Sequence, residues 1–243
     1  QGLIPKTLRP LVEKRLALKN LLLELDPRDC RAGILKARAA ALKWLLVVCF
    51  GYLGYKNARF GKIESHEAVT ALRRELMLQA KEVAEDLGFT VLHMYVDSLF
   101  VQRPGAQHLS HFTPLLEKIA EQTGLSIALD GIYKWVVFPP SKRDLRVPVP
   151  NRYFGVFQGG EIKARGIALR RHDTPKYVAD TQMGILKILA KADDPQKKRR
   201  ESQEYVGKQM SLLREGRIPI EELIISQTLS RPVESYRNPS PTA

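Results

Sequence analysis

The segment Val91–Val101, VLHMYVDSLFV, constrains the fold of this chain more than any other stretch. Read as one β-strand, the segment places alternate side chains on two faces. One face carries Leu92, Met94, Val96, Ser98 and Phe100. The other face carries His93, Tyr95, Asp97, Leu99 and Val101. We expect the first, apolar face to pack against helices. An acid in an apolar strand is costly unless it is paired or binds a metal. Asp97 is therefore a candidate functional residue, and an Asp beside a turn of an edge strand is the alternative.

The charge of the chain favours a polyanionic partner. Its 243 residues carry a formal net charge of +13, and the sequence pI is about 9.8. Nucleic acid is the first candidate for such a partner, although a generally basic surface gives the same totals. The hydrophobic content of 44% is enough for a folded core.

The two cysteines favour a cytoplasmic protein. Cys30 and Cys49 lack metal-ligand spacing, and we expect both to be reduced. The most apolar run, Ala39–Phe50, contains Lys43 and is far shorter than the roughly 20 residues of a membrane span, so no membrane is expected as a partner. The chain begins on Gln1, and we expect it to be a piece of a longer protein.

Residues 1–53 are predicted to form a helical hairpin. Leucines recur at helical spacing, Asp26–Pro27 marks a turn, and the second helix is expected over Asp29–Phe50 with Gly51 as its end. The hairpin carries the cations Arg15, Lys19 and Lys43. These cations form either a solvated face or a clamp for a polyphosphate.

The remaining elements predict an α+β fold in which an antiparallel sheet is backed by helices. Helices are expected over His66–Leu87, Gln107–Gln122, Lys176–Ala192 and Pro195–Arg214, and strands over Arg152–Gln158 and Glu161–Leu169. Leu125–Phe138 is expected to form one strand or a strand pair with a turn at Asp130–Gly131. Gly159–Gly160 predicts the turn of a β-hairpin, and the tail from Ser230 is expected to be weakly ordered.

Four segments in order resemble motifs of family B DNA polymerases. GLIPKTLRPLVEKRLALK is similar to the first fingers helix, and LKWLLVVCFGYLGYKNAR resembles the fingers motif with Lys followed by Asn-Ser-x-Tyr-Gly. YVDSLFV resembles the palm motif Tyr-Gly-Asp-Thr-Asp-Ser, and NRYFGVFQGGEIKARGIALRRHDTP resembles the Lys-Lys-Arg-Tyr segment with the Arg-Arg-Asp that leads into the thumb. The resemblance extends from about Leu3 to Pro239.

The resemblance implies a division into fingers, palm and thumb. The fingers are a helical hairpin at 1–53, the palm spans 54–172 with a catalytic strand at 91–101 and a basic hairpin at 151–170, and a mostly helical partial thumb covers 173–243. The implied activity is template-directed DNA synthesis, with primer–template DNA and dNTP as ligands and a sliding clamp as a further candidate partner. It also implies association with the nucleoid if the source is prokaryotic.

The resemblance also assigns roles to individual residues. Arg15, Lys19 and Lys43 match cations that hold the triphosphate of the dNTP, and Asp97 matches a catalytic acid that binds Mg²⁺ in a two-metal site. Residues that match or suit contacts to DNA are Arg152, Tyr153, Lys197, Lys198, Arg199 and Arg200.

Several departures from the family pattern are visible. Val47, Val48 and Phe50 replace polar fingers residues, and Tyr95 stands where the first palm Asp is expected. The upstream motif Asp-x-x-Ser-Leu-Tyr-Pro and the exonuclease acids are absent from this sequence. The two-metal site is therefore incomplete here, and the N-terminal polymerase part is expected elsewhere in the same or another chain. The alternative is a polymerase-derived DNA-binding or accessory protein that no longer copies DNA.

Four further residues receive structural interpretations. We expect Trp44 and Trp135 to belong to the core. His66 and His93 are expected to be hydrogen-bonded structural residues, because neither has a second His or Cys at metal spacing.

Overall fold

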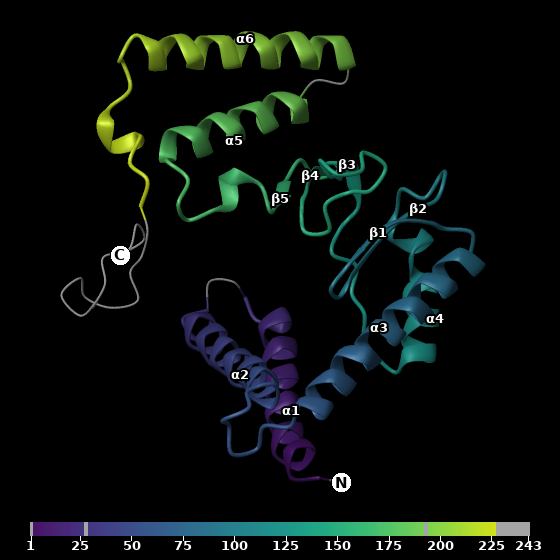
Figure 1. Ribbon diagram of the computed structural model, residues 1–243. Coiled ribbons are helices and arrows are strands. Elements are labelled where there is room, and N and C mark those ends of the chain that lie inside the picture. Colours follow the sequence, from purple (N-terminus) through teal and green to yellow (C-terminus); the bar gives the residue numbers. More distant parts are fainter. Residues whose placement is uncertain (1, 27–28, 192–193, 227–243) are drawn as a thin grey trace, which may run out of the picture. The chain divides into compact units, whose positions relative to one another are not determined.

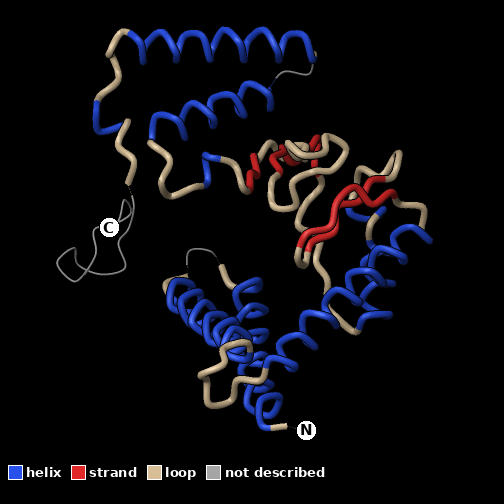
Figure 2. The backbone as a smooth tube through the Cα atoms, in the orientation of Figure 1, coloured by secondary structure: helices blue, strands red, loops and turns tan. Residues whose placement is uncertain are grey.

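The computed structural model describes residues 2–26, 29–191 and 194–226, so the predicted tail from Ser230 lies outside the described residues. The chain divides into two compact units, 1–80 and 81–243. Figure 1 labels the helices and strands, and Figure 2 shows helices together with short strands. All strand pairs are antiparallel, in one two-stranded and one three-stranded sheet within the described residues. The predicted α+β fold class is confirmed.

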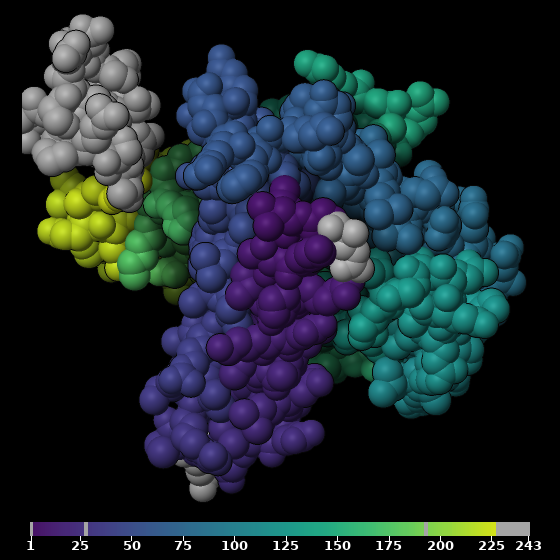
Figure 3. Space-filling model, turned by 90° about the horizontal axis from the view of Figure 1, so that it is seen from below, coloured from purple at the N-terminus to yellow at the C-terminus, as the bar shows by residue number. Residues whose placement is uncertain are grey.

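The first unit is built on a hairpin of α1 (Leu3–Glu24) and α2 (Arg31–Leu53), as predicted. The less exposed side chains of α1 are Ile4, Leu8, Leu11, Arg15, Leu18 and Leu22, and those of α2 are Ala32, Leu35, Ala39, Leu42, Leu46, Cys49 and Leu53. Their spacing alternates between three and four residues, which is the heptad pattern of a coiled-coil seam. Figure 3 shows α1, in purple, lying along α2, in dark blue.

The outer faces of this hairpin stay exposed, including many apolar side chains. Trp44 is 69% exposed, and Leu45, Val47 and Val48 are also exposed. The expectation that Trp44 belongs to the core is wrong, because a two-helix hairpin has one seam and Trp44 lies outside it. The predicted end of α2 at Gly51 is wrong as well, since the helix continues to Leu53 and is capped by Gly54.

Arg15 is the polar exception in the seam of α1. Its Nε is buried and has no hydrogen-bond partner among the described residues. A buried donor without a partner destabilises the folded state by about 1–3 kcal/mol. Arg15 therefore weakens the seam that its apolar neighbours form.

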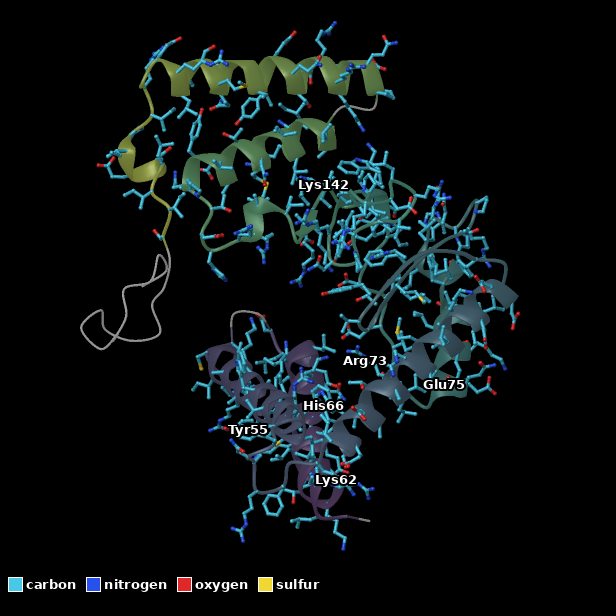
Figure 4. All side chains as sticks on the ribbon, viewed as in Figure 1. Tyr55, Lys62, His66, Arg73, Glu75 and Lys142 are labelled. Atoms are coloured by element: carbon cyan, nitrogen blue, oxygen red, sulfur yellow. The ribbon has the colours of Figure 1, made fainter. Side chains whose placement is uncertain are left out.

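His66 fixes the start of α3 (Ile63–Asp86) to the end of α2. Its Nδ1 lies 3.2 Å from the carbonyl oxygen of Phe50, and the two rings stack with centroids 4.3 Å apart. A Cβ on Gly54 would lie 3.2 Å from the His66 ring, so the backbone passes close to it. His66, labelled in Figure 4, is a hydrogen-bonded structural residue, as predicted.

In the second unit the predicted single strand 91–101 is instead a hairpin. Strands β1 (Thr90–Tyr95) and β2 (Ser98–Gln102) pair with Tyr95 opposite Ser98, which leaves Val96 and Asp97 as a two-residue turn. The expected apolar face is wrong too: Leu92 is 42% exposed, whereas His93 is only 9% exposed. Val91 and His93 lie on the less exposed face, and a register shift interrupts the strand pairing between them.

The second sheet contains β3 (Tyr133–Val137), β4 (Tyr153–Phe157) and β5 (Ile162–Arg165), in that order. The predicted β-hairpin around Gly159–Gly160 is confirmed. The strand predicted over Leu125–Phe138 is shorter than expected, because regular pairing begins only at Tyr133.

An aromatic cluster joins the two sheets. The Nε2 of His93 lies 2.8 Å from the carbonyl oxygen of Pro150, just before β4. The ring of Phe100 on β2 lies 5.1 Å from that of Phe138 and 5.1 Å from that of Tyr153. His93 thus has the structural role that the sequence predicts, and it holds the β1–β2 hairpin against the second sheet.

Helices cover the β1–β2 region and follow the second sheet. The short 3₁₀ helix η1 (Leu109–His111) precedes α4 (Thr113–Thr123), which buries Leu115 and Ile119. The predicted helix 107–122 is thus split into these two elements. Helices α5 (Lys176–Lys191) and α6 (Pro195–Arg214) form a pair in which the Tyr177 hydroxyl donates to the carbonyl oxygen of Gln209 at 2.6 Å. Both helices agree with the prediction, except that Ala192 lies outside the described residues.

Replacing Val96 by Gly should stabilise the second unit. Val96 has φ = 55°, a left-handed conformation that is costly for a β-branched residue and favourable for Gly at the first position of a tight hairpin turn. We expect Val96→Gly to raise the free energy of unfolding in urea by about 1 kcal/mol. The matched control is Val137→Gly, at a strand position that is 41% exposed compared with 43% for Val96. The control should lower stability, and a Val96→Gly variant that also loses stability would contradict the turn assignment.

Replacing Arg15 by Leu should stabilise the helical hairpin. The change fills a seam position with an apolar side chain and removes a buried donor without a partner. We expect the free energy of unfolding to rise by about 1 kcal/mol, measured by chemical denaturation. Arg9→Leu, at an exposed position of the same helix, should change it little. Equal effects of the two substitutions would show that Arg15 does not occupy the seam.

Candidate functional site

The β1–β2 turn presents the Asp97 carboxylate to solvent. Asp97 is exposed, and it has no hydrogen bond or ion pair with the described residues. Because the turn has only two residues, its position depends on the strand pair that His93 fixes to the second sheet. The carboxylate is therefore held at the tip of a supported hairpin and remains free to bind a ligand.

The described residues do not complete a magnesium site. No group of three or more His, Cys, Asp or Glu side chains that could hold a metal ion occurs among them. Asp97 offers one carboxylate, whereas a two-metal site needs carboxylates on both sides of the metal pair. Tyr95, which stands at the position of the first palm acid in the resemblance, lies next to the turn opposite Ser98 and brings no carboxylate.

The three predicted phosphate-binding cations all lie on the α1–α2 hairpin of the first unit. Lys19 follows Arg15 by one helical turn and is exposed, and Lys43 is exposed on α2. Arg15 differs from them because it lies in the seam and its Nε is buried. Two of the three cations are thus accessible to an anionic ligand, and the third is partly enclosed. Asp97 belongs to the other unit.

Arg152 and Tyr153 have different surroundings although they are neighbours. Arg152 is exposed at the start of β4. Tyr153 is only 7% exposed and packs against Phe100 in the aromatic cluster. The ring of Tyr153 thus forms part of the core, and contact of this residue with DNA stays a prediction.

The basic cluster Lys197–Arg200 forms the first turns of α6. Asp194 caps this helix by accepting hydrogen bonds from the backbone amides of Gln196 and Lys197 at 3.1 and 3.0 Å. Lys197 and Arg200 also approach Glu201 and Glu204 at 3.9 Å each. These ion pairs are exposed and weak.

Within the cluster, Lys198 and Arg199 have different neighbours. The Nζ of Lys198 lies 5.5 Å from the centre of the Trp135 ring, and Trp135 is only half-buried. Arg199 is exposed and has no ion pair with the described residues. Arg199 is therefore the member of the cluster most open to a ligand.

A basic pocket between β5 and the 3₁₀ helix η2 (Ala168–Arg170) was not predicted as a site. Its volume is about 530 Å³, and it is lined by Arg165, Gly166, Leu169, Arg170, Arg171 and His172. The signal in the sequence is the dense segment RGIALRRH, in which half of the residues are Arg or His. The sequence alone does not predict a pocket there, because the segment must bend before its basic side chains can line one pocket.

One cation of this pocket is already paired. Arg171 donates hydrogen bonds to both carboxylate oxygens of Asp173, through Nε at 2.8 Å and through Nη2. These hydrogen bonds lower the pKa of Asp173 and raise that of Arg171 from their ordinary values. Arg171 therefore contributes less uncompensated charge to the pocket than its neighbours do.

Within residues 2–26, 29–191 and 194–226, no helix is both long enough and apolar enough to cross a membrane.

Comparisons with known proteins place this geometry in a family. The family profile described as "DNA polymerase family B" matches residues 1–243. DNA polymerase 2 of Saccharolobus solfataricus is 34% identical over 192 residues, which cover 79% of this chain and 27% of that protein. A DNA polymerase of Archaeoglobus fulgidus is 27% identical over 237 residues, covering 98% of this chain and 29% of that protein.

A solved structure supports the same assignment. The family B DNA polymerase from the hyperthermophilic archaeon Pyrobaculum calidifontis matches with a TM-score of 0.64 and 29% identity, over 98% of this chain and 29% of that chain. The chain thus spans less than a third of the length of these relatives. On the match of the family profile to its whole length, this chain belongs to DNA polymerase family B.

Proposed function

We propose that this chain is the fingers, palm and partial thumb of a template-directed DNA polymerase, divided near residues 53 and 172. In its intact form the enzyme binds primer–template DNA and a dNTP and transfers a nucleotide to the primer end. The observation that carries this proposal is the exposed Asp97 carboxylate, which has no partner among the described residues and stands on a turn supported by two packed strands.

The helical hairpin is proposed to bind the triphosphate of the dNTP. Lys19 and Lys43 are exposed cations on its two helices, and Arg15 has a buried Nε without a partner in the described structure. A phosphate group of the dNTP would supply the hydrogen-bond acceptor that Nε of Arg15 lacks. It would thereby offset the cost of placing this cation in the seam. Hydrogen bonds between a guanidinium and phosphate are among the stronger ones in proteins.

The palm is proposed to bind the DNA backbone through Arg152, and the thumb through the cluster Lys197–Arg200. The cluster lies at the N-terminal end of α6, where the helix dipole is positive and cations are unfavourable. No acidic residue lies in the first turn of this helix. A phosphate backbone would compensate this concentration of positive charge. Tyr153 is proposed to anchor the strand that presents Arg152, because its ring is buried.

The magnesium requirement is proposed for the intact enzyme only. Asp97 would supply one carboxylate, and the other ligands would come from the N-terminal polymerase part, in the same or another chain. A sliding clamp remains a candidate partner, and a cytoplasmic, DNA-associated location is part of the same proposal.

A second candidate is a polymerase-derived protein that binds DNA without copying it. Tyr95 favours this candidate, since it stands beside the Asp97 turn where the family pattern has an acid. Val47 and Val48, exposed on α2 in place of polar residues, favour it as well.

Replacing Asp97 by Ala should abolish primer extension and leave DNA binding unchanged. The measurement is magnesium-dependent extension of a primed template by the protein in its natural, intact form, together with the affinity for the same duplex. We expect extension to fall at least 100-fold, because the change removes a carboxylate at the reacting centre. Asp86→Ala, at an exposed acid at the end of α3, is the control and should keep its activity. Extension retained by Asp97→Ala would rule out the assigned role.

Replacing Tyr95 by Asp separates the two candidate functions. If the wild-type protein copies DNA, the added acid should change extension only modestly, since the native site already works. If extension is absent in wild type and appears in Tyr95→Asp, the protein is a binding factor that has lost a metal ligand. Tyr95→Phe serves as the control, because it keeps the ring and adds no carboxylate.

A further inference from the structure

Helix α2 carries a second apolar row outside its seam with α1. This row has the alternating three- and four-residue spacing of a heptad pattern and consists of Ile34, Ala37, Ala41, Trp44, Val48 and Gly51. We call these residues the outer row. All of them are exposed, and the exposed fraction reaches 69% for Trp44 and 59% for Ile34. The outer row thus repeats the pattern of a packed seam on an exposed face of the helix.

Large apolar side chains widen the outer row into a patch. Leu45, Val47 and Tyr52 flank it and are 52–56% exposed. Single exposed apolar side chains are normal on a protein surface, whereas a contiguous patch over about five helical turns marks an interaction site. The hairpin does not use this patch, because α1 packs on the other side of α2.

Positive charge borders the outer row on both sides. At about 100° per residue, Lys36 and Lys43 lie along one margin and Arg38 lies along the other. None of these three cations has an ion pair with a described residue, and α2 contains no Asp or Glu. Arg31 extends the second margin, but its Nη2 is paired with Asp29 at 2.8 Å. The face is therefore apolar along its centre and cationic at its margins.

The charge of the margins favours a partner other than a second copy of this chain. In a two-fold symmetric dimer the same face of each copy meets, so cationic margins would lie against cationic margins. The net charge of +13 adds to this repulsion. In paired helices, opposite charges on the flanks of an apolar seam determine which partner binds. The complementary partner is therefore acidic on its flanks.

The small residues of the outer row favour a helix over a lipid surface. Ala37, Ala41 and Gly51 keep the face shallow between its large side chains, so a second helix can approach α2 closely. A helix that lies in a membrane interface instead turns a charged face to water. The side of α2 opposite the outer row is packed against α1 and is apolar.

We propose that the outer row is the docking surface for an amphipathic helix of a partner protein, which has an apolar centre and Asp or Glu on both flanks. The partner helix buries Ile34 and Trp44, and its acids pair with Lys36 and Arg38. The inference goes beyond the proposed DNA synthesis, because none of these four residues is assigned to the nucleotide or to DNA.

The first test measures the affinity of the full 243-residue chain for a fluorescently labelled helical peptide by anisotropy. The peptide has about three heptads, with Leu at positions a and d and Glu at positions e and g. We expect Ile34→Ser/Trp44→Ser to lower the affinity about tenfold or more, because large apolar anchors dominate such interfaces. The matched control, Leu145→Ser/Val147→Ser, removes two apolar side chains that are 77% and 51% exposed in the other unit, and it should bind as the wild type does.

Reversing the charge of the margins separates a specific docking surface from general adhesion of apolar residues. Lys36→Glu/Arg38→Glu should lose about tenfold in affinity for the Glu peptide and should gain affinity for a peptide with Lys at the same positions. Lys6→Glu/Arg9→Glu reverses two exposed cations of α1 and is the control, with both affinities nearly unchanged. Circular dichroism verifies folding, and the gain for the Lys peptide is a signal that an unfolded variant would not give.

Three outcomes would overturn the inference, and none of them affects the proposed polymerase function. The first is a wild-type chain that does not bind the Glu peptide or binds the Lys peptide equally well. The second is binding to vesicles of phosphatidylserine and phosphatidylcholine that requires Ile34 and Trp44 when the peptide does not bind, which would assign the outer row to a membrane surface. The third is a wild-type dimer in sedimentation that Ile34→Ser/Trp44→Ser converts to a monomer, which would assign the outer row to a second copy.

Discussion

The contact between His93 and Pro150 is the interaction on which the second unit depends. It joins the strand that leads to Asp97 to the residue just before Asn151–Arg152. Phe100, Phe138 and Tyr153 surround this contact with ring packing. The exposed acid and the exposed arginine are thus held by one buried cluster. A change in the aromatic cluster is therefore expected to shift Asp97 and Arg152 together, because it moves both the β1–β2 hairpin and the start of β4.

The first unit follows a different principle, since a single seam holds its two helices. One seam suffices for a hairpin, but it leaves the remaining surface of both helices to solvent or to a partner. The outer faces carry both the exposed cations Lys19 and Lys43 and several large apolar residues. The hairpin therefore presents its charged and apolar side chains on surfaces that the packing of its two helices does not use. Among Arg15, Lys19 and Lys43, only Arg15 lies in the seam. The proposed binding of a phosphate by Arg15 would therefore change the stability of the hairpin.

The sequence predicted the helices better than the strands, for physical reasons. Helix α6 begins as expected because Asp194 and Pro195 are strong N-terminal signals. The sequence indicates a turn beside Asp97 only as an alternative, because Val96 stands where glycine or asparagine usually marks a hairpin turn. The candidate site shows the same contrast. Asp97 was predicted from its neighbours along the chain, whereas the basic pocket depends on the bend after β5, where the amide of Leu169 on η2 bonds to Gln182 on α5, a contact that no local pattern encodes.

The placement of the two tryptophans gives each unit its own optical reporter. The sequence contains two Trp residues, and they fall in different units: Trp44 is exposed on α2, and Trp135 is half-buried on β3 beside Lys198. Trp44 already emits from a solvated position, so unfolding of its unit changes its fluorescence little, whereas small quenchers reach it freely. Trp135 loses a packed environment on unfolding. Quenching of Trp44 therefore reports access to the surface of the hairpin, and a change in the emission of Trp135 reports unfolding of the second unit.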